Sequence, residues 1–331
     1  MSETLPNLEK IACLGAGRMG RGIAVVFAYA GHEVAVCDLK ARPEADFQRL
    51  ADEVHAEIKD TLQILASLGL FDGTHIPAII KRVRVVADAD KAAALADSDV
   101  VFEGIPEVLE MKRELFAKVS PLVPPQTIIA STTSTILVDD LSGSVEHPER
   151  FLNAHWLNPA FLVPLVELSP GAKTLPAITK KLSDLLERIG KVPVTCAARP
   201  GYIVPRIQTL AMNEAARMVE EGVATAADID KALKYGFGFR FSVLGVLEFI
   251  DWGGGDILYY ASRYLVNALD NDRYAAPPII EQNMKDGRTG LRAARGFLDY
   301  EGMDIDAYRK ERLGGFAQRL KALGLARPPA P

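Results

Sequence analysis

Blocks of apolar and polar positions alternate along the first forty residues, and they predict a strand, a helix and a second strand. Residues 10–15 form a short apolar run, residues 21–30 an apolar stretch of helical length, and residues 32–38 a second run that ends in an acid. A connection this short, with one helix in it, joins parallel strands through a right-handed crossover. The chain is therefore predicted to begin with a strand–helix–strand unit.

From residue 41 to residue 70 the pattern changes to apolar positions at helical spacing, with charged residues between them. These positions are Leu50, Val54, Ile58, Leu62 and Leu65. Because a helix returns to the same face every three to four residues, the stretch is predicted to be a long amphipathic helix. It forms an insert between the second strand and the third.

Short apolar runs and helical patterns continue to alternate as far as residue 199. Further strands are predicted at residues 84–87, 100–103, 127–131, 151–157, 162–168 and 193–196, with Asn158-Pro159 in the turn between the fourth and fifth of these. Helices are predicted at 107–119 and 178–189. After residue 199 only helical patterns follow, at 206–221, 226–235, 256–268 and 278–285. We expect an α/β domain over residues 1–199, with the insert at 41–70, and an all-helical domain over residues 200–331.

The amino-acid composition and charge argue against several classes of protein. The 331 residues are 49% apolar and 24% charged, and the net charge is −5. No basic stripe indicates nucleic-acid binding, and no apolar run is long enough to span a membrane. The N-terminal stretch does not have the pattern of a signal peptide, and the three cysteines form no metal-binding spacing, so we expect a cytoplasmic protein without a metal.

A glycine-rich turn joins the first strand to the first helix. Gly15, Gly17 and Gly20 match G-x-G-x-x-G, with Met19 inside the motif, and Asp38 ends the next strand. Such a turn lets the backbone approach a pyrophosphate at a helix N-terminus, and the acid accepts hydrogen bonds from the adenosine ribose. A carboxylate at residue 38 would repel a 2′-phosphate, which favours NAD over NADP. The pattern predicts a Rossmann-type parallel sheet with helices on both faces.

One ionisable pair lies in the apolar stretch HWLNPAFLVPLVEL. His155 and Glu167 are its only two ionisable residues. One interpretation is a buried polar contact that joins two strands. The other is a couple for proton transfer, because the ordinary pKa of histidine suits acid–base catalysis near neutrality. The residues alone leave both interpretations open.

Segments along most of the chain resemble the 3-hydroxyacyl-CoA dehydrogenase family. The resemblance runs from Ile11 to Tyr300 and includes CLGAGRMGRGIA, VVFEGIPEVLEMKRELF, ASTTSTI, HWLNP, PLVEL, RPGYIVPR and TGLRAARGFLDY. It implies an NAD-dependent oxidoreductase that acts on CH–OH groups and forms a homodimer through its helical domain.

The resemblance also implies roles for individual residues. His155 corresponds to the catalytic base, Glu167 to the residue that orients it, and Ser134 to the serine that binds the reacting oxygen. Asn158 and Glu103 correspond to positions beside the nicotinamide. These residue types suit the oxidation of a secondary alcohol, which needs a base for the hydroxyl proton and donors that hold the oxygen in place.

Two segments depart from the acyl-CoA enzymes of the family. Pro205 replaces an asparagine that contacts the substrate, and Gln208, one helical turn further on, is the candidate to replace it. In GFGFRFSVLGVLEF, Arg240 gives a pattern closer to relatives that oxidise free acids, such as gulonate and carnitine dehydrogenases. A guanidinium binds a carboxylate through two parallel hydrogen bonds, whereas a thioester offers no such partner. A surface position or an ion pair between subunits is the other interpretation of Arg240.

The expected function is oxidation of the 3-hydroxyl of a short 3-hydroxy acid to the 3-keto acid, or the reverse, with NAD. One alternative is a short-chain (S)-3-hydroxyacyl-CoA dehydrogenase that acts on 3-hydroxybutyryl-CoA. The other is a non-catalytic NAD-binding protein, since the resemblance includes lens crystallins. The expected partner is therefore a small hydroxy or keto acid or a short acyl-CoA, with no nucleic acid and no membrane.

Overall fold

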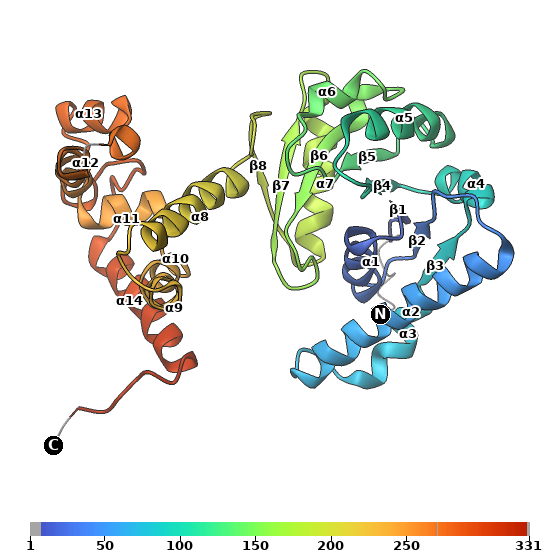
Figure 1. Ribbon diagram of the computed structural model, residues 1–331, viewed down its shortest axis with the longest axis horizontal. Coiled ribbons are helices and arrows are strands. Elements are labelled where there is room, and N and C mark those ends of the chain that lie inside the picture. The colour runs from blue at the N-terminus through green and yellow to red at the C-terminus, as the bar shows by residue number, and fades with distance from the viewer. Residues whose placement is uncertain (1–7, 270, 330–331) are drawn as a thin grey trace. The chain divides into compact units, whose positions relative to one another are not determined.

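The computed structural model describes residues 8–269 and 271–329. The chain forms two compact units, Met1–Ala211 and Met212–Pro331 (Figure 1). Their division falls inside helix α8 (Val204–Glu220). The predicted domain boundary after residue 199 stays a prediction.

An eight-stranded sheet forms the centre of the N-terminal unit, in the order β3-β2-β1-β4-β5-β6-β7-β8. Its strands are β1 (Ile11–Leu14), β2 (Val34–Cys37), β3 (Val83–Val86), β4 (Val100–Glu103), β5 (Ile128–Ser131), β6 (Phe151–Trp156), β7 (Leu165–Pro170) and β8 (Val192–Thr195). All neighbours pair in parallel except β6 and β7, which are antiparallel. The strand order reverses between β1 and β4, and nucleotides bind at such a switch point.

Helices cover both faces of this sheet (Figure 1). One core cluster joins the sheet to α1 (Arg18–Tyr29), α2 (Glu44–Ser67), α3 (Ile76–Ile80) and α7 (Pro176–Arg188). The other joins it to α4 (Lys91–Ala96), α5 (Leu109–Val119) and α6 (Val138–Ser142). Successive residues of β1 alternate between the two clusters, as the period of a strand requires. The predicted α/β sheet with helices on both faces is confirmed.

The C-terminal unit is built from helices. They are the second half of α8, then α9 (Ala226–Ala232), α10 (Phe239–Phe241), α11 (Val246–Gly253), α12 (Gly255–Leu269), α13 (Pro278–Lys285) and α14 (Ile305–Ala322), with a π-helical turn at Leu233–Gly238. The carboxylate of Asp251, which is 2% exposed, accepts hydrogen bonds from the backbone of Phe297 and Leu298 and from the Tyr300 hydroxyl. The predicted all-helical second half is confirmed.

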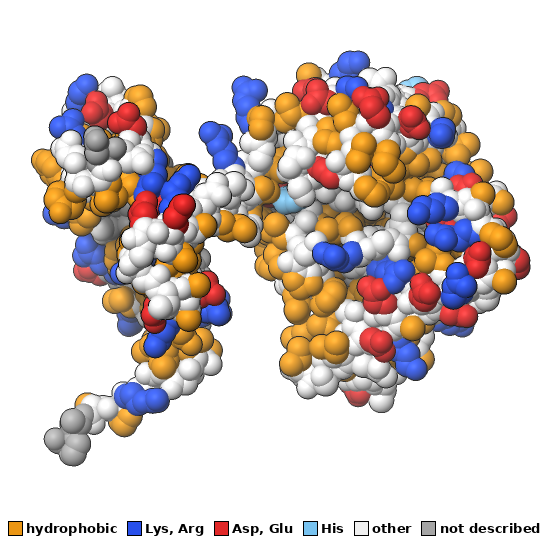
Figure 2. Space-filling model, viewed as in Figure 1, with side chains coloured by type: hydrophobic (Ala, Val, Ile, Leu, Met, Phe, Trp, Pro, Cys, Tyr) orange, Lys and Arg blue, Asp and Glu red, His pale blue; other side chains and the backbone are white. Residues whose placement is uncertain are grey.

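The charged and apolar side chains are distributed as the composition predicts. On the face that Figure 2 shows, acidic and basic side chains are mixed over both units. No helix among the described residues is both long enough and apolar enough to cross a membrane. Cys13 and Cys37 are buried core residues, and burial raises the pKa of the Cys37 thiol to about 11.

Candidate active site

His155 and Glu167 lie directly opposite each other in the antiparallel pair of β6 and β7. The Nδ1 atom of His155 is 2.8 Å from Oε2 of Glu167. The glutamate is fully buried and the histidine is 4% exposed. The two side chains that are twelve positions apart in the sequence therefore meet because the turn between the strands sets their register.

Glu167 is held in its ionised form. Burial acts to raise its pKa, but hydrogen bonds from His155 and from the backbone of Val204 and Ile203 hold the pKa below its ordinary value. Both backbone N–H groups donate to Oε1 at 2.9 Å, at the start of α8. An ionised carboxylate only accepts hydrogen bonds, so Nδ1 of His155 carries the proton. The Nε2 atom of a neutral His155 is then the free base.

Ser134 lies next to the Nε2 atom of His155. Its Oγ atom is 3.1 Å from Nε2 of His155, so the hydroxyl donates to the imidazole when no substrate is present. Ser134 follows β5, and its backbone N–H and that of Thr135 donate to the Glu107 carboxylate at 2.9 Å each. Burial acts to raise the pKa of Glu107, but hydrogen bonds from Thr133 and Thr135 lower it below its ordinary value. Glu107 therefore fixes the loop that presents Ser134.

Tyr202 packs flat against the imidazole of His155. The ring centroids are 5.2 Å apart and the planes differ by 20°. The Tyr202 hydroxyl donates to the Thr133 carbonyl and accepts from Nδ2 of the buried Asn153. Tyr202 adopts a φ of 43°, a conformation that costs a non-glycine residue about 1–3 kcal/mol. The surrounding contacts compensate for that strain, and they clamp the ring of the candidate base from one side.

The glycine turn fits the pyrophosphate of a dinucleotide. Gly15 has a φ of 105°, and a Cβ on Gly20 would lie 2.1 Å from the Gly15 carbonyl oxygen, so neither position accepts a side chain. No atom lies within 4 Å of a Cβ built on Gly17, which leaves open space above the turn. Gly17 is the N-cap of α1, and the first N–H groups of this helix, including that of Met19, point toward that space. The residues of this turn fit the predicted cofactor.

Asp38 lies just after β2, at the predicted ribose position. Its carboxylate accepts hydrogen bonds from the backbone of Leu39 and Lys40 and, at 2.5 Å, from the Arg42 side chain. A carboxylate has about four acceptor positions, so one remains for a ribose hydroxyl. The sequence does not show that Arg42 pairs with Asp38, because the contact depends on how the loop after β2 folds.

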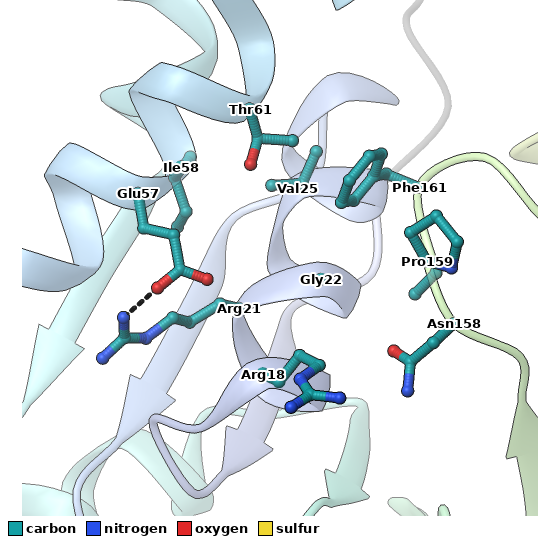
Figure 3. A pocket seen from close by; sticks show the side chains of 11 residues that line it. Arg18, Arg21, Gly22, Val25, Glu57, Ile58, Thr61, Asn158, Pro159 and Phe161 are labelled. Atoms are coloured by element: carbon teal, nitrogen blue, oxygen red, sulfur yellow. Dashed lines mark hydrogen bonds and ion pairs between the residues drawn. The ribbon is translucent and has the colours of Figure 1, made fainter. Parts of the chain in front are cut away.

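Glu103 and Asn158, both predicted beside the nicotinamide, have different surroundings. Glu103 is fully buried, and its carboxylate accepts hydrogen bonds from Lys112 at 2.6 Å and Ser131 at 2.5 Å. Because Glu103 is buried, the structure gives no direct support for its predicted contact with the cofactor. Asn158 is exposed in the turn after β6 and lines a pocket formed with α1 and α2 (Figure 3). Both roles stay predictions.

The predicted substrate residues lie on helices. Gln208 is an exposed residue of α8. Arg240 lies in α10 of the C-terminal unit, with its guanidinium 5.1 Å from the ring centroid of Phe249. Within residues 8–269 and 271–329, Arg240 forms no ion pair, and no group of three or more potential ligand side chains could hold a metal. The substrate roles of Gln208 and Arg240 stay predictions.

Two positioning residues escaped the sequence analysis. Glu107 falls inside the quoted segment VVFEGIPE, and Tyr202 inside RPGYIVPR, but neither contact can be derived from spacing. The signals that could have found them are an acid just after a strand end and an aromatic residue after a Pro-Gly turn. Both act across large sequence separations, which only the folded chain reveals.

Comparison with known proteins assigns both parts of the chain to one family. The sequence model of the 3-hydroxyacyl-CoA dehydrogenase NAD binding domain matches residues 10–199, and that of the C-terminal domain of the same family matches residues 201–300. A 3-hydroxyadipyl-CoA dehydrogenase of Escherichia coli is 34% identical over 89% of this chain, which spans 59% of that protein. A 5-formyl-3-hydroxy-2-methylpyridine 4-carboxylate 5-dehydrogenase of Mesorhizobium japonicum is 30% identical over 92% of this chain and 95% of its own length.

The fold agrees with a solved structure as well. A 3-hydroxyacyl-CoA dehydrogenase of Archaeoglobus fulgidus superposes with a TM-score of 0.74 and 29% identity, over 96% of this chain and 100% of that one. The family models together match residues in both units of the chain, as far as residue 300. The chain therefore belongs to the 3-hydroxyacyl-CoA dehydrogenase family and is an NAD-dependent oxidoreductase acting on CH–OH groups.

Proposed function

We propose that this protein oxidises the 3-hydroxyl of a short 3-hydroxy acid to the 3-keto acid with NAD, or catalyses the reverse reaction. The observation that supports the proposal most is the line of Glu167, His155 and Ser134. Its two contacts measure 2.8 Å and 3.1 Å. This arrangement is that of a general base whose second nitrogen is oriented by a carboxylate.

In the proposed reaction each residue of the site has a separate role in the proton transfer. NAD, when bound at the glycine turn, supplies the hydride acceptor. The substrate hydroxyl replaces Ser134 as the hydrogen-bond partner of His155, and Ser134 donates to the reacting oxygen. Nε2 of His155 takes the hydroxyl proton. The ionised Glu167 stabilises the imidazolium that forms, and Tyr202 restricts the ring to the plane in which both contacts are made.

A free acid is proposed as substrate because of Arg240 and Pro205. Within the described residues Arg240 has no carboxylate partner, so its guanidinium can bind one from a substrate. Pro205, in the first turn of α8, has neither an N–H nor a polar side chain with which to bind a substrate. The Mesorhizobium japonicum relative is named for a substrate with a carboxylate group.

A short acyl-CoA is the second candidate substrate. The Escherichia coli relative and the Archaeoglobus fulgidus structure are both named for acyl-CoA substrates. The same base, orienting carboxylate and hydroxyl donor would serve either substrate, because the chemistry occurs at the 3-hydroxyl in both.

The test is NADH formation by the purified protein with free 3-hydroxy acids and with (S)-3-hydroxybutyryl-CoA in parallel. We expect a higher kcat/KM with a free acid, and Arg240→Gln should lower this kcat/KM about tenfold or more, the loss expected for one charge-assisted contact. Arg263→Gln, which removes an exposed arginine of α12 in the same unit, is the control. A higher kcat/KM with the thioester, unaffected by Arg240→Gln, would contradict the free-acid assignment.

We also propose that the protein is a cytoplasmic homodimer. Helix α12 exposes apolar and aromatic side chains on the C-terminal unit, among them Ile257 at 61%, Tyr260 at 64% and Tyr264 at 71%. Such a patch is typical of an interface between protein surfaces. Light scattering after size exclusion tests it: a mass twice that of the chain is expected, and Tyr264→Glu should shift it to the monomer. A monomeric wild-type protein would contradict the proposal.

A further inference from the structure

Helix α14 packs along the Arg240 segment, by which we mean residues 238–249 (Figure 1). The helix begins at Ile305, whereas the match to the C-terminal domain of the family ends at residue 300. Its partly buried residues recur at helical spacing on one face, and they are Ile305, Tyr308, Arg312, Gly315 and Phe316. Because this face includes an arginine and a glycine, particular contacts rather than a continuous apolar stripe hold the helix in place.

Two apolar contacts of α14 lie on either side of Arg240 in the sequence. The Phe316 ring stacks on that of Phe239, with the ring centroids 5.6 Å apart and the planes differing by 29°. Gly315 lies against Val243, since a Cβ on this glycine would be 2.9 Å from a methyl group of Val243. Phe239 directly precedes Arg240, and Val243 lies one helical turn after it. Helix α14 therefore contacts the chain just before and just after Arg240.

A polar cluster joins α14 to the start of α11. The Glu248 carboxylate accepts hydrogen bonds from the Tyr308 hydroxyl and, at 2.7 Å, from Nε of Arg312. Its other oxygen accepts from the backbone N–H of Gly245 at 2.9 Å. Burial acts to raise the pKa of Glu248, but the hydrogen bonds from Tyr308, Gly245 and Arg312 hold the pKa below its ordinary value. The ionised Glu248 therefore fixes the first turn of α11 to α14.

The Arg240 guanidinium lies over a ring that is next to this cluster. It is 5.1 Å from the ring centroid of Phe249, and Phe249 directly follows Glu248 in the sequence. The Phe241 ring meets the same ring edge to face, with 5.9 Å between the centroids. Arg240 is exposed, so its guanidinium is open to a ligand. Both the backbone of Arg240 and the ring beneath its guanidinium thus belong to the segment that α14 contacts.

We propose that α14 positions Arg240 to bind the carboxylate of the substrate, and that the stacking of Phe316 on Phe239 is the main contact through which it does so. The inference rests on the proposed function, because it concerns the same carboxylate. Two parallel hydrogen bonds between a guanidinium and a carboxylate require a defined direction as well as a defined distance. A segment that moves relative to α11 therefore weakens them. Phe316 acts through Arg240 and is a positioning residue.

The kinetic test uses Phe316→Ala with the preferred free 3-hydroxy acid. The KM for this acid should rise about threefold to tenfold, while kcat and the KM for NAD stay unchanged, because Arg240 binds the substrate and takes no part in the proton transfer. Phe316→Tyr, which keeps the stacked ring, should retain the wild-type KM. Leu313→Ala, on the exposed side of the same helix, is the matched control and should also leave the KM unchanged.

A double variant shows whether α14 acts through Arg240. In Arg240→Gln/Phe316→Ala the kcat/KM should equal that of Arg240→Gln alone, because the second substitution then has no guanidinium left to displace. The kcat/KM for (S)-3-hydroxybutyryl-CoA, which offers no carboxylate at this position, should be the same in Phe316→Ala and in the wild type. Phe316→Leu, which keeps an apolar side chain without the ring, is measured in parallel as a milder variant that preserves the fold.

Hydrogen exchange separates this inference from the proposed function. The backbone N–H groups of residues 242–244 donate to carbonyls within the Arg240 segment. In Phe316→Ala and Phe316→Leu these amides should exchange faster than in Leu313→Ala. Faster exchange, with no effect of Arg240→Gln on any substrate, would support the positioning by α14 while the free-acid function fails. Unchanged exchange, or a loss of kcat/KM in the double variant that is the sum of the two single losses, would overturn the inference.

Discussion

Glu167 faces His155 across the antiparallel pair of β6 and β7, with its Oε2 atom 2.8 Å from the imidazole Nδ1. The other oxygen of the same carboxylate accepts two backbone N–H groups at the start of α8. One buried charge thus fixes the tautomer of the candidate base and also ties the strand pair to the helix that follows. Both the mechanism and the stability of the contact between this strand pair and α8 therefore depend on the Glu167 carboxylate.

Glu167→Gln should lower kcat by about 10²–10⁴-fold. The amide retains the shape of the side chain but can no longer stabilise an imidazolium beside it. Steady-state NADH formation measures the loss, and NADH fluorescence should show an unchanged Kd for the cofactor. Glu187→Gln, on the exposed face of α7, is the matched control for the loss of one carboxylate. A Glu167→Gln variant with near-wild-type kcat would show that the pair is only structural.

The same substitution should change how stability depends on pH. The pKa of Glu167 is lowered in the folded protein from its ordinary value of 4.5. Its stabilising contribution is therefore complete above pH 4.5 and disappears as the pH falls through the folded pKa. The difference in Tm between wild type and Glu167→Gln should be largest near pH 7 and should shrink below pH 4.5. A difference that grows on acidification would contradict this sign.

Tyr202 offers a test of how the histidine ring is held. Tyr202→Phe keeps the stacked ring and loses the hydrogen bonds to Thr133 and Asn153, so we expect about 0.5–1.5 kcal/mol less stability per lost bond and a nearly unchanged kcat. Tyr202→Ala removes the ring and should lower kcat by about tenfold or more with little change in KM. Chemical denaturation and steady-state kinetics measure the two effects. Equal kcat losses in both variants would contradict the role of the Tyr202 ring in holding the imidazole of His155.

Asp38 and Arg42 should govern the choice of cofactor. Asp38→Ala removes the predicted partner of the ribose and releases the Arg42 guanidinium from its ion pair. The KM for NAD should rise by about tenfold, as expected for a lost hydrogen bond to a charged group, and NADP should become a better substrate relative to NAD. Kinetics with both cofactors measure the shift. In the double variant Asp38→Ala/Arg42→Ala the gain for NADP should be absent, and its persistence would exclude Arg42 from the effect.

The strands and most helices near the site could be predicted because they carry strong local patterns. The runs ending at Gly15 and Asp38 and the helical period through Leu62 depend only on neighbouring residues, and the structure confirms them. Helix α14 was not predicted, because Gly314 and Gly315 interrupt a stretch with no clear apolar face. Gly315 lies close to Val243, since a Cβ there would be 2.9 Å from that side chain. This close approach joins distant parts of the sequence, and a local pattern does not show it.

The candidate site, too, could be predicted from the sequence only in part. The residues His155 and Glu167 could be selected from the sequence, but whether they meet depends on strand register, which spacing alone does not settle. Glu107, Tyr202 and the Arg42–Asp38 pair were not predicted. Each of these contacts is made through a loop or between distant segments, and no periodicity encodes such contacts.

The central claim is that His155 is the base, and His155→Gln tests it most directly. The variant should be measured for NADH formation with the preferred hydroxy substrate, alongside NADH binding by fluorescence. We expect kcat to fall by about 10²–10⁴-fold, the usual contribution of a positioned base, with the Kd for NADH unchanged. A His155→Gln variant that keeps most of its turnover would contradict the account, and the pair with Glu167 would then be a structural contact between β6 and β7.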